Sequence, residues 1–202
     1  MVNKFLVPAG FKDSLNFDAS IEHKYKNIIV NFFTDNGFIL IKTPLIEYSK
    51  NLDSNTLILK TNKRKDQLSI RNDITPQIIR IASSRLANKI RPLKLCYYGE
   101  VVRKVGTILR PERQFQQVGA EIIGSESYKA DVEIINLAYK TLKKIGVKNI
   151  VIEITAPFFL DSLLKKITNR NFKNQLKKFI KLKDINSCLK LLKEDELYNS
   201  FK

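Results

Sequence analysis

The sequence predicts an α+β fold in which an antiparallel β-sheet is flanked by helices, expected on one of its faces, with a C-terminal helical extension. Strand-like runs joined by polar turns predict hairpins, and segments with apolar residues at helical spacing lie between them. From Pro157 onward the pattern is helical and basic. We therefore expect a core domain at residues 1–156 and a helical extension at residues 157–202.

A helix, a strand and a hairpin are expected in the first part of the chain. The helix begins near Asp18, and Asn36-Gly37 supplies its C-terminal stop. A short strand follows at Phe38–Ile41. Thr56–Lys60 and Gln67–Arg71 then flank a polar turn and are expected to pair as a hairpin.

A second helix is expected after Thr75, which is a suitable N-cap before Pro76. Its apolar spacing would turn four residues toward the core: Ile78, Ile79, Ala82 and Leu86. The remaining expected elements are a hairpin of Leu93–Lys104 and Gln114–Gly124, a helix at Tyr128–Ile145, and a strand at Asn149–Thr155.

Composition narrows the functional classes. Hydrophobic residues make up 44% and charged residues 28%, as in ordinary soluble proteins, and no apolar run approaches the roughly 20 residues that cross a bilayer. The N-terminus lacks the apolar core of a signal peptide, so we expect a cytoplasmic protein. Cys96 and Cys188 lie far apart and His23 stands among charged neighbours, so neither a metal site nor histidine-dependent catalysis is expected.

The net charge of +16 raises the question of a nucleic-acid partner, because Lys and Arg neutralise phosphates. Lysines occur along the whole chain, however, in pairs such as Lys143-Lys144, Lys165-Lys166 and Lys177-Lys178 that are typical of solvated helix faces. A nucleic acid is therefore not the partner that we expect.

Gln117, Gly119 and Glu121 share one face of their strand, because strand side chains alternate between faces. The glycine would leave room for a ligand on the sheet. Gln117 offers donors and an acceptor, and Glu121 offers a carboxylate. With Arg103 on the neighbouring strand, these residues form a set suited to a zwitterion. The alternative is that Arg103 and Glu121 only pair with each other.

Asp73 and Thr75 form a second cluster, which either caps the following helix or adds a carboxylate to the ligand set. A nucleotide site has less support. The chain has no glycine-rich phosphate loop, Pro111 interrupts Arg110 and Arg113, and no acidic set suggests Mg²⁺. Neither a cofactor nor a metal is expected.

Two segments resemble signatures of class II aminoacyl-tRNA synthetases. Gly37-Phe38 followed by Thr43–Glu47 resembles the first signature, a dimer-interface element. Tyr97–Arg103 followed by Arg113–Glu121 resembles the second signature in its histidyl-tRNA synthetase form. The resemblance runs from about Phe5 to the C-terminus.

Departures from the synthetase pattern make the chain similar to the family of ATP phosphoribosyltransferase regulatory subunits, which are non-catalytic paralogues of histidyl-tRNA synthetase. Asp73–Gln77 stands where synthetases carry a Pro-Glu-Gly-Thr segment. Val105 and Gly106 follow Arg103, and Pro111 lies where the ATP-binding loop is basic.

The resemblance implies a histidine-binding set of Asp73, Thr75, Arg103, Gln117 and Glu121. Asp73, Thr75 and Gln117 would receive the ammonium of the ligand. Arg103 would receive its carboxylate, and Glu121 its imidazole. The implied function is non-enzymatic: a regulatory subunit that the short-form catalytic subunit requires in the first step of histidine biosynthesis. L-Histidine would be an effector, and the chain would be a homodimer within a hetero-oligomer.

Members of this family are longer, so the chain is expected to be short or truncated. Two alternatives remain open. One is a histidyl-tRNA synthetase, or a fragment of it, which would activate histidine with ATP. The other is a basic RNA-binding module that uses the positive charge.

Overall fold

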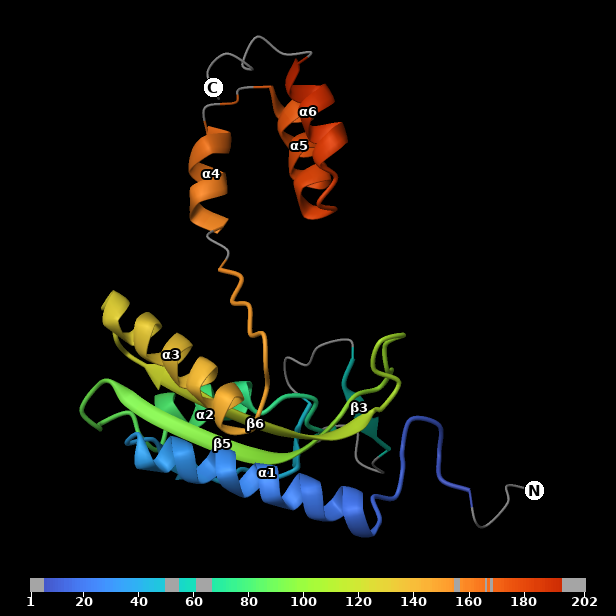
Figure 1. The fold of residues 1–202 in the computed structure, drawn as a ribbon, viewed down its shortest axis with the longest axis vertical. Coiled ribbons are helices and arrows are strands. Elements are labelled where there is room, and N and C mark those ends of the chain that lie inside the picture. The colour runs from blue at the N-terminus through green and yellow to red at the C-terminus, as the bar shows by residue number, and fades with distance from the viewer. Residues whose placement is uncertain are drawn as a thin grey trace. The chain divides into compact units, whose positions relative to one another are not determined.

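The computed structural model describes residues 6–49, 55–60, 67–154, 157–165, 167 and 169–193 (Figure 1). Contacts group the chain into two units, Met1–Ile150 and Val151–Lys202, which are described separately here. The predicted α+β class, with strands flanked by helices, is confirmed. The domain boundary that we placed at residue 157 remains a prediction.

In its described residues, the first unit contains two three-stranded sheets, ordered β1-β5-β6 and β2-β4-β3. Its elements in chain order are α1 (Asn16–Asp35), β1 (Ile39–Ile41), β2 (Ile46–Tyr48), β3 (Leu57–Leu59), β4 (Leu68–Ile70), α2 (Thr75–Ser83), β5 (Leu93–Val102), β6 (Gln114–Ile123) and α3 (Tyr128–Lys144). Both predicted hairpins are confirmed, because β3 pairs with β4 and β5 pairs with β6 in antiparallel register. The polar turn predicted between β3 and β4 lies outside the described residues.

One sheet is mixed rather than antiparallel throughout. β1 pairs in parallel with β5, with Ile39 opposite Leu95 and Ile41 opposite Tyr97. Parallel neighbours require a long connection, and here the chain passes through the second sheet and α2 before it returns as β5. Local strand patterns contain no information about such a return, so the prediction of an antiparallel sheet was wrong at this edge.

Helices cover both faces of the long β5–β6 hairpin, although we expected them on one face (Figure 1). On one face, Leu95 packs in a buried cluster with Ile78 of α2. On the other face, Cys96 packs with Phe33 of α1 and Leu137 of α3. Successive residues of β5 are therefore buried on opposite faces, which is typical of a strand inside a layered core.

The predicted strand at Asn149–Thr155 is not formed in its described part, residues 149–154. Val151 is 89% exposed and Ile154 is 72% exposed. Apolar alternation shows only that a segment would suit a pleated surface, and it becomes a strand when another strand offers a ladder. No such partner is found among the described residues.

A buried arginine ties the elements of the first unit together. Arg71, which is 7% exposed, follows β4. Its guanidinium donates to the hydroxyl of Thr43 at 2.8 Å, the side-chain oxygen of Gln77 at 3.2 Å and the carbonyl of Glu100 at 2.7 Å. It also donates to the carbonyl of Pro44 at 3.3 Å. These acceptors precede β2, lie on α2 and lie on β5, so one side chain links both sheets and a helix.

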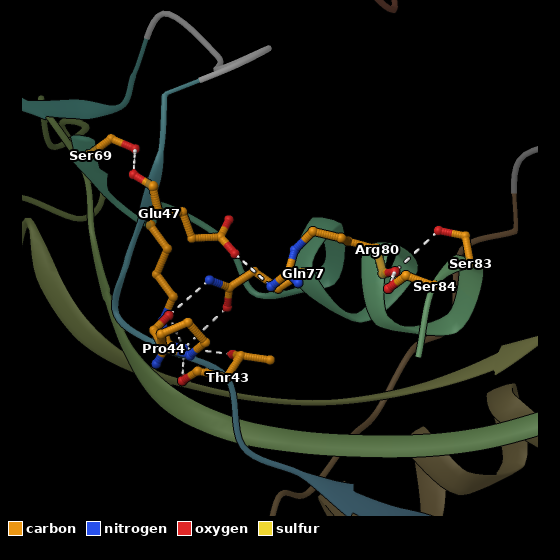
Figure 2. Close-up of polar contacts among 9 residues, drawn as sticks. Thr43, Pro44, Glu47, Ser69, Gln77, Arg80, Ser83 and Ser84 are labelled. Carbon is orange, nitrogen blue, oxygen red and sulfur yellow. Dashed lines mark hydrogen bonds and ion pairs between the residues drawn. The ribbon is translucent and has the colours of Figure 1, made fainter. Parts of the chain in front are cut away.

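The same junction includes a contact between α2 and the segment before β2. Figure 2 shows Gln77 directed toward Thr43 and Pro44, and its amide nitrogen donates to the Pro44 carbonyl at 2.8 Å. One turn further along α2, Arg80 forms an ion pair with Glu47 of β2 at 2.9 Å. The start of α2 is thus held in place from outside the hairpin.

Gly99 of β5 is required at this junction. A Cβ at this position would overlap the Nη2 atom of Arg71, so the missing side chain makes room for the guanidinium. Burial lowers the pKa of Arg71, and the nearby Glu47 and Glu100 partly offset that effect.

The second unit is helical in its described part. It contains α4 (Pro157–Lys165), α5 (Arg170–Lys181) and α6 (Ile185–Lys193). Leu164, Ile167, Phe172 and Leu176 form its buried cluster. No helix in the described parts of either unit is long and apolar enough to cross a membrane.

Candidate functional site

The predicted site residues of β6 lie on the face of the hairpin that α2 covers. Gln117 is opposite Gly99, Gly119 is opposite Tyr97 and Glu121 is opposite Leu95. Paired residues in an antiparallel ladder project to the same face, and Leu95 packs against α2. The start of α2, with Asp73 and Thr75, is thereby brought to these strand positions.

Asp73 and Gln117 bind each other directly. The side-chain nitrogen of Gln117 donates to Oδ1 of Asp73 at 2.7 Å, and its oxygen accepts the backbone N–H of Ile74 at 3.1 Å. The same Asp73 oxygen accepts the backbone N–H of Thr75 at 3.3 Å. Both side chains are half-buried, so the pair is fixed but still reached by solvent.

Thr75 and Glu121 bind each other directly, and the hydroxyl of Tyr97, which was not part of the predicted set, lies beside both. The Thr75 hydroxyl lies 3.0 Å from Oε1 of Glu121 and 2.9 Å from the hydroxyl of Tyr97. Tyr97 itself lies 3.4 Å from the same Glu121 oxygen. Each hydroxyl has one proton, so the two shorter contacts are satisfied together when Tyr97 donates to Thr75 and Thr75 donates to Glu121.

The expectation that Thr75 caps α2 is wrong. Thr75 is the first helical residue, the N-cap is Ile74, and no side chain of the N-cap residue forms a capping bond. Asp73 supplies the local support instead, because its carboxylate accepts the Thr75 amide. Because the Thr75 hydroxyl does not cap the helix, it can bind Glu121 of β6 instead.

The room that we expected above Gly119 is filled by the protein itself. A Cβ at Gly119 would overlap the ring and hydroxyl of Tyr97. Tyr97 is 4% exposed, so its ring lies over the strand. Sequence reasoning missed this residue, although the pairing of a large aromatic residue with a glycine across the ladder is a signal that could have revealed it.

The pKa of Tyr97 is raised to about 12, mainly because burial disfavours the charged phenolate; the charges of Glu121 and Asp73 also raise it, and the bond to Thr75 opposes them. Tyr97 therefore stays protonated at neutral pH. It supplies a hydrogen-bond donor beside the two carboxylates.

Arg103 lies on the same face but stands apart from this network. Gly99 is opposite Gln117, and Arg103 is four residues beyond Gly99 (99 to 103), about 13 Å further along the sheet. Its guanidinium lies 4.9 Å from the centre of the Phe115 ring, a cation–π contact. No ion pair joins Arg103 to Glu121, so the predicted alternative of a simple cross-hairpin pair is wrong.

The two carboxylates suit a small molecule that carries an ammonium or an imidazole. Oδ1 of Asp73 and Oε1 of Glu121 accept protein donors, while no donor to their second oxygens is found among the described residues. These oxygens can accept from an ammonium or an imidazole. Arg103 offers a cation toward the other end of the same face. The site has ligand-binding groups, and nothing in it resembles a nucleophile paired with a base.

A larger hollow lies elsewhere in the first unit. A cavity of about 680 Å³ lies between the segment before α1 and the strand ends, lined by residues that include Asp13, Glu22, Glu100 and Gln116. None of the five predicted site residues lines it. The hydrogen-bonded cluster presents ordered ligand-binding groups, whereas the hollow is lined by both acidic and basic side chains.

The mixed sheet, the covered hairpin and this polar set together define a class II aminoacyl-tRNA synthetase-like fold. The family model described as histidyl-tRNA synthetase matches residues 10–201, and the chain belongs to this family.

Curated relatives within this family carry the name ATP phosphoribosyltransferase regulatory subunit. The chain is 37% identical over 163 residues to that of Paramagnetospirillum magneticum, covering 77% of this chain and 43% of the relative. It is 38% identical over 170 residues to that of Rhodospirillum centenum, covering 80% of this chain and 44% of the relative. The chain thus spans less than half the length of these relatives.

A solved structure whose description includes the same name is similar to this chain. The crystal structure of an ATP phosphoribosyltransferase regulatory subunit/histidyl-tRNA synthetase from Bacillus halodurans is 25% identical and has a TM-score of 0.80. The match covers 96% of this chain and 52% of that one. Because nearly the whole chain is covered, the similarity extends across the long β5–β6 hairpin.

Proposed function

We propose that this chain serves as a non-catalytic regulatory subunit of ATP phosphoribosyltransferase, the enzyme of the first step of histidine biosynthesis, and that it binds L-histidine. The observation that carries the proposal is the hydrogen-bonded set of Asp73, Thr75, Gln117 and Glu121 in a chain whose curated relatives bear that name. The partner is the short-form catalytic subunit.

The proposed ligand contacts follow from the positions of these groups. Asp73, Thr75 and Gln117 lie together at the start of α2 and bind the ammonium. Glu121 lies four residues along β6 from Gln117 (117 to 121) and binds the imidazole. Arg103 lies on the same face about 13 Å along the sheet from Gln117, so its long side chain is proposed to swing from Phe115 toward the start of α2, where it meets the carboxylate. Histidine binding then shifts the catalytic assembly between states, because the ligand has different affinities for them.

The turn between β5 and β6 supports a non-catalytic role. It contains Val105, Gly106 and Pro111 where nucleotide-binding relatives need acidic and basic groups for ATP. Ile108 and Leu109 at its apex are almost wholly exposed and carry no charge. The apex itself offers no charged group to a triphosphate, and the cations Lys104 and Arg110 lie only at its base.

The ligand proposal predicts that Glu121→Gln weakens histidine binding. The amide keeps an oxygen for the Thr75 hydroxyl but loses the charge that strengthens a hydrogen bond to the imidazole. The lost interaction is worth about 1.5–3 kcal/mol, so the dissociation constant rises by about ten- to a hundredfold. Isothermal titration calorimetry of the full chain with L-histidine, alone and with the catalytic subunit, measures this dissociation constant.

Glu126→Gln is the matched control, because Glu126 is exposed in the loop before α3. It removes the same charge and is expected to leave the dissociation constant unchanged. Equal weakening by both variants would show a general charge effect. No binding of L-histidine by the wild-type chain in the presence of the catalytic subunit would refute the ligand proposal.

A histidyl-tRNA synthetase activity is the second candidate, favoured by the description of the matching family model. That activity requires ATP and produces pyrophosphate exchange in the presence of histidine. The regulatory proposal predicts no exchange by the chain and stimulation of ATP phosphoribosyltransferase activity when the chain is added to the catalytic subunit. Measurable exchange would favour the synthetase.

A further inference from the structure

The turn that joins β5 to β6 presents aliphatic side chains to solvent. Ile108 and Leu109 are 102% and 97% exposed, and Val105 is 62% exposed. Single exposed apolar side chains are ordinary on protein surfaces, but these belong to one short turn. We call Val105, Ile108 and Leu109 the hairpin tip.

The hairpin tip is held in a defined shape. The backbone N–H of Thr107 donates to the Arg110 carbonyl at 2.8 Å, and the Arg110 N–H donates to the Thr107 carbonyl at 3.1 Å and to its hydroxyl at 3.0 Å. The N–H of Val105 donates to the side chain of Asn55 at 2.9 Å. A preformed turn loses little conformational freedom when it binds a partner, which favours affinity.

Basic residues lie at the base of the tip. Lys104 and Arg110 flank it in sequence, and Arg103 and Arg110 both lie 4.9 Å from the centre of the Phe115 ring. No ion pair involving these three basic residues is found in the described part of the chain. The surface is therefore an apolar apex on a positively charged base.

We propose that the hairpin tip docks into an apolar pocket, bordered by carboxylates, on the catalytic subunit. This inference rests on the proposed function, which supplies the partner. Burying the exposed aliphatic pair on association gives a favourable apolar contribution, and the surrounding cations give orientation and a faster encounter with an acidic rim.

A protein pocket fits the tip better than RNA does. Proteins bind RNA chiefly through phosphate contacts and through stacking of bases on aromatic or arginine planes. The apex, Thr107-Ile108-Leu109, has neither charge nor an aromatic ring. RNA binding and self-association through the tip are therefore competing outcomes of the test.

The test compares the full wild-type chain with the double variant Ile108→Ser, Leu109→Ser. Its affinity for the purified short-form catalytic subunit, measured by biolayer interferometry, is expected to fall by at least about tenfold, because the aliphatic pair forms the centre of the proposed contact. Ile90→Ser is the control, because Ile90 is 91% exposed in the connection before β5. It is expected to bind as the wild type does.

A second variant tests the charged base independently. Lys104→Glu with Arg110→Glu leaves the aliphatic residues in place and is expected to slow association, with an effect that shrinks as salt is added. Circular dichroism of both double variants checks that the fold is retained.

The outcomes separate this inference from the proposed function. If the wild-type chain does not bind the catalytic subunit, the proposed function fails and the inference fails with it. If it binds and both double variants bind equally well, only the tip inference is overturned. Loss of RNA binding or of dimer mass in the Ile108→Ser, Leu109→Ser variant, with catalytic-subunit binding unchanged, also overturns it.

Discussion

At the scale of residues, Tyr97 explains how the candidate site can be polar and still packed. Its ring fills the space above Gly119, and its hydroxyl completes the chain of hydrogen bonds that ends at Glu121. The site therefore orders its carboxylates before any ligand arrives. Preordered groups favour ligand binding because less freedom is lost on association.

Because the pKa of Tyr97 is raised in the folded state, the fold is expected to lose stability at alkaline pH. In the unfolded chain the phenol has its ordinary pKa of 10.0, whereas in the folded chain its pKa is about 12. Between these values the folded state binds more protons, so its stability falls as the pH rises. The free energy of unfolding of the wild type and of Tyr97→Phe can be measured with urea between about pH 9 and pH 12. Over this range the wild type is expected to lose about 2–3 kcal/mol more than Tyr97→Phe.

Tyr128→Phe is the control for that measurement, because Tyr128 is 72% exposed. Its unfolding free energy is expected to follow the wild type across the same pH range. A constant difference between the wild type and Tyr97→Phe from neutral to strongly alkaline pH would contradict the buried, protonated phenol.

The candidate residues themselves could be named from sequence, because Gln117 and Glu121 share a strand face and Asp73 and Thr75 start a helix. The contact between the two groups could not, because it depends on where α2 lies on the hairpin. The separation of Arg103 from Gln117, about 13 Å along the sheet, follows only from the register in which β5 pairs with β6.

At the scale of elements, α2 has one buried and one exposed face. Ile78 is 0% exposed, whereas its neighbour Ile79 is 55% exposed, although we expected both to face the core. Adjacent positions on a helix differ by about 100° in direction, so both cannot lie on a narrow apolar stripe. The first turn of α2 also positions Thr75.

This contrast gives a matched pair of substitutions. Ile78→Ala leaves a cavity in the cluster that includes Leu95 and is expected to lower the unfolding free energy by about 2–5 kcal/mol. Ile79→Ala is expected to change it by no more than about 0.5 kcal/mol. Urea denaturation of both variants measures the difference, and equal losses would mean that α2 is rotated from the orientation described.

The long hairpin was predictable because its evidence is local: two alternating runs joined by a turn. The parallel pairing of β1 with β5 was not, because it joins residues 39–41 to residues 95–97. The predicted strand at Asn149–Thr155 failed for a related reason. A sequence pattern shows that a segment can pair, but not whether a partner strand is present.

At the scale of the whole molecule, each unit has a buried cluster of its own. Compact units with separate cores unfold with a degree of independence. A substitution in one core should therefore affect mainly its own unit. This property also bears on the predicted division into a core domain and a helical extension.

Leu176→Ala tests the independence of the two units. Leu176 is 4% exposed in the cluster of the second unit, so its truncation is expected to speed amide exchange in α5 and α6. Exchange in β5 and β6, measured by mass spectrometry, is expected to stay as in the wild type. Leu95→Ala should give the reverse pattern. Faster exchange in both units after Leu176→Ala would show that the chain unfolds as one body.

The contact between Arg71 and Gly99 constrains how these two positions can change during evolution. Any side chain at position 99 would overlap the Arg71 guanidinium, and loss of Arg71 would remove the donor to the carbonyls of Thr43 and Glu100. A substitution at either position alone is therefore expected to destabilise the fold. We expect the two to be inherited as a pair, with relatives that replace one of them also replacing the other.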